Sequence, residues 1–161
     1  MGHGLDAEHP LCDRIQLIML MLFFSVWGID AFIVSIFGYS TIITHVLAFP
    51  LLLGGTILFL GLSFYLVLQS HKAVFEPVRD TPMLVDSGVY SWVRHPMYLG
   101  IMLFCLSFIF VSVSLISIAI WIALFVFYDR MATFEEKNLI KILGERYKVY
   151  QVRVSKWIPG L

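Results

Sequence analysis

The stretch RHPMYLG, residues 94–100, decides how the chain folds, because it separates a polar segment from a long apolar run. Pro96 lacks a backbone N–H, which a first helical turn does not need, so the sequence predicts an apolar helix that begins there. His95 then takes the position of an N-cap residue. Arg94 places a guanidinium beside the positive end of the helix dipole.

The first residues of this predicted helix offer hydrogen-bond donors. We expect the backbone N–H groups of Met97, Tyr98 and Leu99 to be unpaired there, which suits a small anionic group. Gly100, one turn further on, has no Cβ and lets another backbone or a ligand approach closely. This start of the helix is therefore a candidate binding site.

The apolar run that follows is too long for one membrane crossing. Residues 97–128 carry no charge, and a single straight helix of that length would measure about 48 Å against a hydrocarbon core of about 30 Å. A hairpin fits better, with its turn at the weak helix formers of VSVS, residues 111–114. The second limb should continue as a helix to Glu135 and Glu136, which would return near the level of Arg94.

The composition is that of a membrane protein. The 161 residues are 60% hydrophobic and only 14% charged, with 16% aromatic residues and a formal net charge of zero, and the mean hydropathy is +0.88. An ordinary soluble domain has about 25% charged residues. A nucleic-acid partner is not expected, since there is no basic excess to offset phosphates.

These patterns predict an all-α fold, a polytopic transmembrane helix bundle in one domain, residues 1–161. It has about four spans, a C-terminal helical hairpin and an amphipathic cytoplasmic tail helix that either rests on the membrane surface or also closes over a site. The expected ranges are about 15–37, 46–70, 97–111 and 114–134 for the spans, 71–96 for a polar loop and 137–161 for the tail.

The basic residues predict the orientation. Arg14, Lys72, Arg79 and Arg94, together with the seven basic residues from Arg130 to Lys156, fall on one side of a four-span bundle. The connections near 38–45 and 111–114 carry none. By the positive-inside rule that side is cytoplasmic, and both termini lie there with it.

The cysteines favour neither a disulfide framework nor a metal site. Cys12 and Cys105 are far apart, and the sequence has no CxxC pair and no cysteine–histidine cluster. We therefore expect no metal, and Cys105 should pack within its helix.

An ordered set of motifs resembles a known family. The lead-in LVDSGVYSWVRHP, the RHPxYxG run, the glutamate pair and the closing EEKNLIKILGERYKVYQVRVSKWIP are similar to the isoprenylcysteine carboxyl methyltransferase and phospholipid methyltransferase family of integral membrane enzymes. Each piece is weak by itself, but the order of the set is specific. The resemblance covers roughly residues 84–159.

The resemblance implies S-adenosyl-L-methionine as cofactor. Its carboxylate would be held by Arg94 and the helix start, and its ammonium or ribose by Glu135 or Glu136, which point about 100° apart on a helix. His95 would either contact the adenine or only cap its helix. The residues expected to bind the cofactor are Arg94, His95, Tyr98, Leu99, Gly100, Glu135 and Glu136.

The resemblance also implies a lipophilic or prenylated acceptor that reaches the enzyme among membrane lipids. An isoprenylcysteine-type carboxylate would be placed by a cation, for which Arg130 and Arg153 are candidates. An amine of a phospholipid or another lipid would instead need a base. Two other classes stay open: an NADPH-dependent enzyme similar to sterol reductases, and a four-span protein without enzymatic activity.

Overall fold

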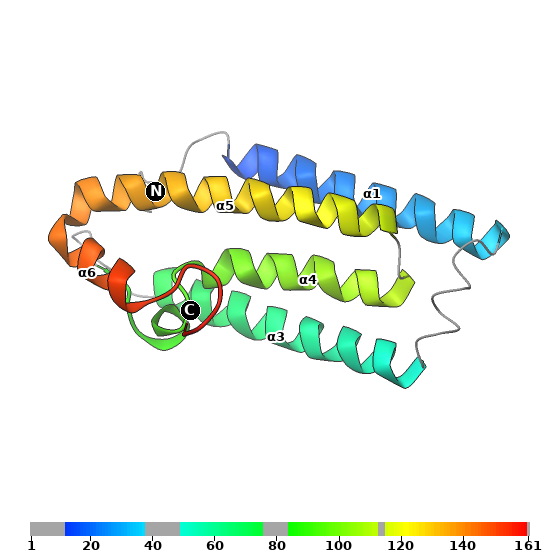
Figure 1. Cartoon of the computed structure of the whole chain (residues 1–161), viewed down its shortest axis with the longest axis horizontal. Coiled ribbons are helices and arrows are strands. Elements are labelled where there is room, and N and C mark those ends of the chain that lie inside the picture. The colour runs from blue at the N-terminus through cyan, green and yellow to red at the C-terminus, as the bar shows by residue number, and fades with distance from the viewer. Residues whose placement is uncertain (1–11, 38–48, 76–83, 113–114, 161) are drawn as a thin grey trace.

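The computed structural model describes residues 12–37, 49–75, 84–112 and 115–160, and these residues contain helices and no β-strand. Four long helices lie side by side in alternating directions (Figure 1). The elements are α1 Cys12–Phe37, α3 Phe49–Phe75, the 3₁₀ helix η1 Gly88–Ser91, α4 Pro96–Ser112, α5 Leu115–Leu143 and α6 Glu145–Arg153. The predicted all-α bundle is confirmed.

Three of the helices are long and apolar enough to cross a bilayer. These are α1, α3 and α5, while α4 is equally apolar but has only 17 residues, about 25 Å of helix. Many large apolar side chains, such as Leu17, Phe32 and Leu58, are exposed on the outside of the bundle. Exposure of this kind suits lipid contact, and the chain is an integral membrane helix bundle.

The predicted hairpin has its expected limbs. Helix α4 begins at Pro96, and α5 runs without a break from Leu115 through the glutamate pair to Leu143. Gly144 follows with a φ of 59°, which favours glycine and ends the helix before α6.

Two helices run beyond the expected limits of their spans. Helix α3 ends at Phe75 rather than near residue 70, and Lys72 in its last turn favours the helix dipole. Helix α5 continues to Leu143 and so includes the first part of the expected tail at 137–161. The expected connection at 38–45 and most of the polar loop, 76–83, lie outside the described residues. The limits of the membrane spans and the side on which the termini lie stay predictions.

Two tightly packed helix pairs are joined through α4. Helix α3 packs mainly on α4, α1 packs on α5, and α4 also contacts α1 and α5. A Cβ at Gly100 would lie 2.7 Å from Val67 Cγ2 and 3.2 Å from the carbonyl oxygen of Ser63. Gly100 therefore serves the close approach of α4 to the backbone of α3, one of the two uses expected for it.

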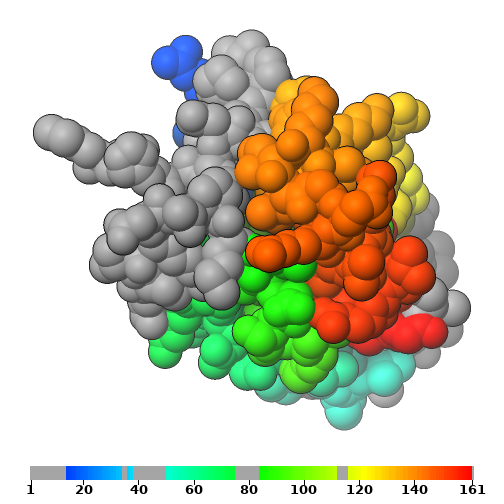
Figure 2. Space-filling model, turned by 90° about the vertical axis from the view of Figure 1, so that its left-hand side faces the viewer, coloured from blue at the N-terminus to red at the C-terminus, as the bar shows by residue number. Residues whose placement is uncertain are grey.

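The core lies between α1, α4 and α5. Its buried side chains are Phe23, Tyr98, Met102, Cys105, Ile109, Leu124, Tyr128, Met131 and Ala132. The start of α4 and the second half of α5 meet at the same end of the bundle, where α6 and the chain end also lie (Figure 1). Seen from that end, α6 and the last residues lie beside the segment that leads into α4 (Figure 2).

Candidate functional site

The start of α4 is built by backbone hydrogen bonds and burial. Pro96 is buried, and the N–H of Leu99 donates to the carbonyl oxygen of His95 at 3.0 Å. Our expectation that the N–H of Leu99 is unpaired was wrong. Counting from His95 as N-cap, Leu99 is the first residue whose N–H reaches a carbonyl four positions back, and the helical hydrogen bonds begin there.

Arg94 holds the chain end against the start of α4. Its Nε donates to Glu136 Oε1 at 2.8 Å, and its Nη1 donates to the carbonyl oxygens of Gln151 at 2.9 Å and Val154 at 2.6 Å. Its backbone N–H donates to the carbonyl oxygen of Ser155 at 2.9 Å. Arg94 thus joins three segments that are far apart in the sequence.

His95 lies between the two glutamates. Its Nε2 is 3.1 Å from Glu136 Oε1, its Nδ1 is 3.5 Å from Glu135 Oε2, and the residue is only 7% exposed. Burial lowers the pKa of His95, but the hydrogen bonds and charges of Glu135 and Glu136 outweigh it, so the pKa lies above its ordinary value. Both ring nitrogens face carboxylates, which suits the protonated imidazolium.

Glu135 also accepts a hydrogen bond from a side chain of α4. The hydroxyl of Tyr98 donates to Glu135 Oε1, and the ring of Tyr98 stacks parallel to that of His95, with centroids 5.8 Å apart. Gln151 Nε2 donates to Glu136 Oε2 at 3.0 Å. We call the group Arg94, His95, Tyr98, Glu135, Glu136 and Gln151 the polar cluster.

The charges of the polar cluster balance when His95 is protonated. Arg94 and His95 then carry two positive charges, and Glu135 and Glu136 carry two negative charges. The four side chains that form its ion pairs are at most 13% exposed, so water screens them weakly. Loss of the His95 proton leaves one excess negative charge, which a cationic group beside the glutamates would balance.

The chain end is anchored on α5 by a second set of contacts. Lys156 Nζ donates to Asp129 Oδ1 at 2.7 Å and to Thr133 Oγ1 at 2.8 Å. Trp157 Nε1 donates to the same Asp129 oxygen at 2.9 Å. The ring of Trp157 then lies 5.8 Å from that of His95, so the chain end forms one wall of the polar cluster.

The structure brings together most of the residues expected to bind the cofactor, and leaves others outside. Arg94, His95, Tyr98, Glu135 and Glu136 contact one another. Gly100 contacts α3 instead, and Leu99 packs against the apolar core.

The two arginines expected to position the acceptor lie outside the polar cluster. Arg130 is exposed. Arg153 forms an ion pair with Asp86 at 2.7 Å, and both side chains are largely exposed. Their roles stay predictions, and the contacts described here do not connect either one with His95 or the glutamates.

Sequence reasoning missed Gln151 and the anchor at Asp129. The signal for Gln151 was its position next to Tyr150, a buried residue of α6. The hydroxyl of Tyr150 donates to the carbonyl oxygen of Tyr90 at 2.6 Å. That hydrogen bond holds α6 against the segment before α4. In this position Gln151 donates to Glu136. For Asp129 the signal was a lone carboxylate at the end of an uncharged run.

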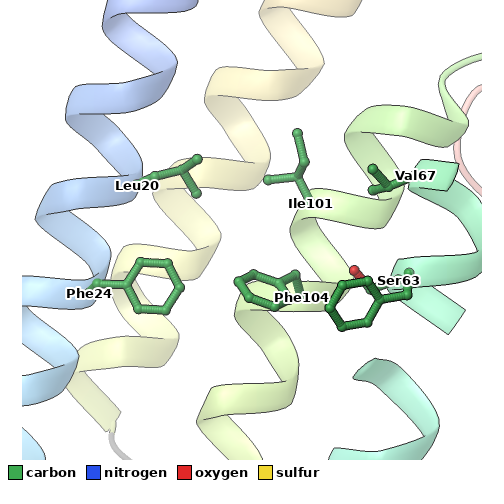
Figure 3. Close-up of a pocket in the computed structure, with 7 residues that line it drawn as sticks. Leu20, Phe24, Ser63, Val67, Ile101 and Phe104 are labelled. Atoms are coloured by element: carbon green, nitrogen blue, oxygen red, sulfur yellow. The ribbon is translucent and has the colours of Figure 1, made fainter. Parts of the chain in front are cut away.

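An apolar groove opens beside the start of α4, between α1, α3 and α4. It has a volume of about 250 Å³ and is lined by Leu20, Phe24, Ser63, Phe64, Val67, Ile101 and Phe104. Leu20 and Phe24 face Ile101 and Phe104 across it (Figure 3). Ile101 is three residues after Tyr98, so the groove lies about one helical turn from the polar cluster.

A second apolar cavity lies toward the opposite ends of α4 and α5. Its volume is about 390 Å³, and its lining is Leu52, Leu106, Ile109, Phe110, Ile118, Trp121 and Ile122. Trp121 Nε1 donates to the carbonyl of Met102 at 2.8 Å, which closes the seam between α4 and α5 on that side.

These features define a class: a membrane helix bundle with a buried ionic cluster at one end of its helices and apolar cavities alongside. The model of the phospholipid methyltransferase family matches residues 43–146, and the chain belongs to this family. The family resemblance found in the sequence is thereby confirmed.

Several relatives bear the name protein-S-isoprenylcysteine O-methyltransferase. That of Schizosaccharomyces pombe is 34% identical over 95 residues, which cover 56% of this chain and 38% of the relative. That of Dictyostelium discoideum is 35% identical over 89 residues, 55% of this chain and 38% of the relative. The human protein is 31% identical over 100 residues, 62% of this chain and 33% of the relative. The matched part thus spans less than two fifths of each relative's length.

Proposed function

We propose that this chain is an S-adenosyl-L-methionine-dependent methyltransferase that methylates the carboxylate of an isoprenylcysteine-type lipid. The observation that carries the proposal is the buried polar cluster, which places two glutamates, an arginine and a histidine together at one end of a membrane bundle. Family membership and the names of the relatives support the reaction class.

The chemistry of the polar cluster fits the cofactor. S-adenosylmethionine has a cationic sulfonium and ammonium, for which Glu135 and Glu136 offer acceptors, and a carboxylate, for which Arg94 and the N–H groups at the start of α4 offer donors. His95 and Trp157 offer flat rings beside these groups. When bound, the cofactor supplies a methyl group on a sulfur leaving group, so that a carboxylate acceptor needs no general base.

The chain's own residues would act by positioning and by excluding water. The anchors of the chain end, Arg94 and Asp129, hold Trp157 over His95. Fixing a donor and an acceptor in line can lower a barrier by several kcal/mol, up to about 7 to 11 in model reactions. The groove beside Ile101 would take the hydrocarbon chain of the acceptor, since its lining is almost entirely apolar.

A phospholipid amine is the second candidate acceptor, favoured by the family to which the chain belongs. An amine must lose a proton before it attacks, and Glu135 would be the base because it lies in the polar cluster and already accepts from Tyr98. The two acceptors therefore differ in their need for a carboxylate at position 135.

Titration calorimetry of the purified protein in detergent tests the cofactor. We expect binding of S-adenosylmethionine and S-adenosylhomocysteine and no binding of NADPH. Binding of NADPH alone would favour the reductase-like class, and binding of none of the three would favour a protein without enzymatic activity. Transfer of a labelled methyl group to an S-prenylated cysteine, compared with phosphatidylethanolamine, then identifies the acceptor, and transfer to the phospholipid alone would overturn the carboxylate assignment.

A further inference from the structure

Tyr128 lies on the face of α5 that leads to the polar cluster. It precedes Glu135 by seven residues, two helical turns, so the two side chains leave the helix in nearly the same direction about 10 Å apart along the axis. Its ring lies 5.3 Å from that of Tyr98, whose hydroxyl donates to Glu135. Tyr128 thus lies next to the polar cluster, on the side toward the middle of the apolar helices.

The hydroxyl of Tyr128 has no hydrogen-bond partner, although the residue is only 1% exposed. Two other buried tyrosines have a hydrogen-bond partner: Tyr98 donates to Glu135, and Tyr150 donates to the carbonyl oxygen of Tyr90. The neighbours of Tyr128 in the core, such as Phe23 and Leu124, are apolar.

A buried hydroxyl without a partner is unfavourable, because folding removes it from water without a replacement bond. Phenylalanine would fill the same volume without this penalty. The hydroxyl is therefore accounted for by a partner that is not part of the chain.

The charges of the site indicate what that partner is. The cations of the polar cluster, Arg94 and His95, both face glutamates, and Arg94 is already assigned to the carboxylate of the cofactor, so neither cation is left for the carboxylate of the acceptor. It needs a further donor. The hydroxyl of Tyr128 is a buried donor without a hydrogen bond, about two helical turns from Glu135 on the same face of α5.

The apolar groove provides the route. Three of its lining residues, Leu20, Phe24 and Ile101, pack against the core cluster that contains Tyr128. A hydrocarbon chain in the groove would therefore border the layer of Tyr128 and Tyr98.

We infer that the hydroxyl of Tyr128 donates a hydrogen bond to the carboxylate of the methyl acceptor, and so is a positioning residue that selects a carboxylate lipid. This rests on the proposed function. The bond fixes one carboxylate oxygen and leaves the other to accept the methyl group.

The test compares two ligands in two proteins. Binding of an S-farnesylated cysteine and of S-farnesyl cysteamine, which lacks the carboxylate, is measured by titration to the wild type and to Tyr128→Phe in detergent. We expect Tyr128→Phe to weaken binding of the carboxylate ligand at least fivefold and to leave binding of the cysteamine unchanged. Tyr65→Phe, an exposed tyrosine of α3, is the matched control and should change neither.

The thermal midpoint of Tyr128→Phe should equal or exceed that of the wild type, since an unpaired hydroxyl is removed. Equal binding of the carboxylate ligand by both proteins would overturn the inference, and so would a clear loss of thermal stability, which would mean that the hydroxyl is paired within the chain. Titration of the wild type with S-adenosylmethionine separates the two proposals: if the cofactor does not bind but Tyr128 still discriminates the ligands, the proposed reaction fails and the carboxylate site stands.

Discussion

Arg94 Nε and Glu136 Oε1 lie 2.8 Å apart, although 42 residues separate them in the sequence. The pair joins the start of α4 to α5, and the same guanidinium also donates hydrogen bonds to the carbonyl oxygens of Gln151 and Val154. One side chain therefore ties the polar cluster to the segment that covers it. A ligand that pairs with Arg94 must exchange with Glu136 or with these carbonyl groups.

Removal of Arg94 should affect both binding and stability. We expect Arg94→Ala to weaken S-adenosylmethionine binding at least tenfold, about 1.4 kcal/mol. It leaves Glu136 buried without its closest ion-pair partner, and loss of one member of a buried ion pair costs about 3 to 5 kcal/mol. Titration calorimetry and thermal unfolding in detergent measure the two effects.

The exposed Arg146 of α6 provides the control. Arg146→Ala removes the same charge and should leave the affinity and the thermal midpoint within error of the wild type. If Arg94→Ala binds the cofactor as the wild type does, the role proposed for Arg94 is wrong.

Stability should fall as the pH rises through neutrality, because of His95. The pKa of His95 is raised in the folded protein, so its contribution is complete below the pKa of the unfolded imidazole, about 6.5, and is lost as the pH rises through the folded value. The thermal midpoint, measured from about pH 6 to about pH 9, should therefore decrease. A cationic donor should bind more tightly over the same range, since the polar cluster becomes more negative.

The His95→Gln variant separates this effect from other titrations. Its thermal midpoint should be flat over this pH range. The same slope in His95→Gln would contradict the assignment.

The sequence alone predicted the helix bundle, and it predicted that the glutamate pair returns to the end of the bundle where Arg94 lies. Hydrophobic length predicted α1, α3 and the hairpin of α4 and α5, because a bilayer limits how far an uncharged helix extends. It also followed that Glu136 returns to the level of Arg94, and the structure places them in contact.

The contacts inside the polar cluster could not be read from the sequence. Whether Arg94 faces Glu136 or a ligand depends on how α6 packs, and α6 is held by a bond from Tyr150 to the backbone of Tyr90, which leaves no pattern in the residues. The lack of a hydrogen-bond partner for the Tyr128 hydroxyl could not be predicted from the sequence either, because Tyr128 is one of several aromatic residues in an apolar run.

Gly100 should tolerate no side chain. A Cβ there would lie 3.2 Å from the carbonyl oxygen of Ser63, a backbone atom that cannot turn away, so Gly100→Ala should push α4 from α3 and cost about 1 to 3 kcal/mol. Gly61 of α3 is the matched control, because a Cβ there meets nothing within 4 Å. Gly61→Ala should be neutral or stabilising in thermal unfolding, and equal midpoints for the two variants would refute the contact.

Filling the groove should separate the acceptor from the cofactor. Ile101→Trp places a large ring among Leu20, Val67 and the other lining residues, so we expect the KM for a prenylated acceptor to rise at least fivefold while the affinity for S-adenosylmethionine stays within twofold. An added ring in a packed site commonly costs about 1 to 3 kcal/mol, so thermal unfolding is measured in parallel.

The second cavity supplies the comparison for this variant. Ile122→Trp adds the same ring at the far end of the α4–α5 seam, where no part of the acceptor is expected. It should leave the KM for the acceptor unchanged. If Ile122→Trp raises the KM and Ile101→Trp does not, the hydrocarbon chain lies between α4 and α5 rather than in the groove of α1, α3 and α4, and the lipid reaches Tyr128 from the opposite side.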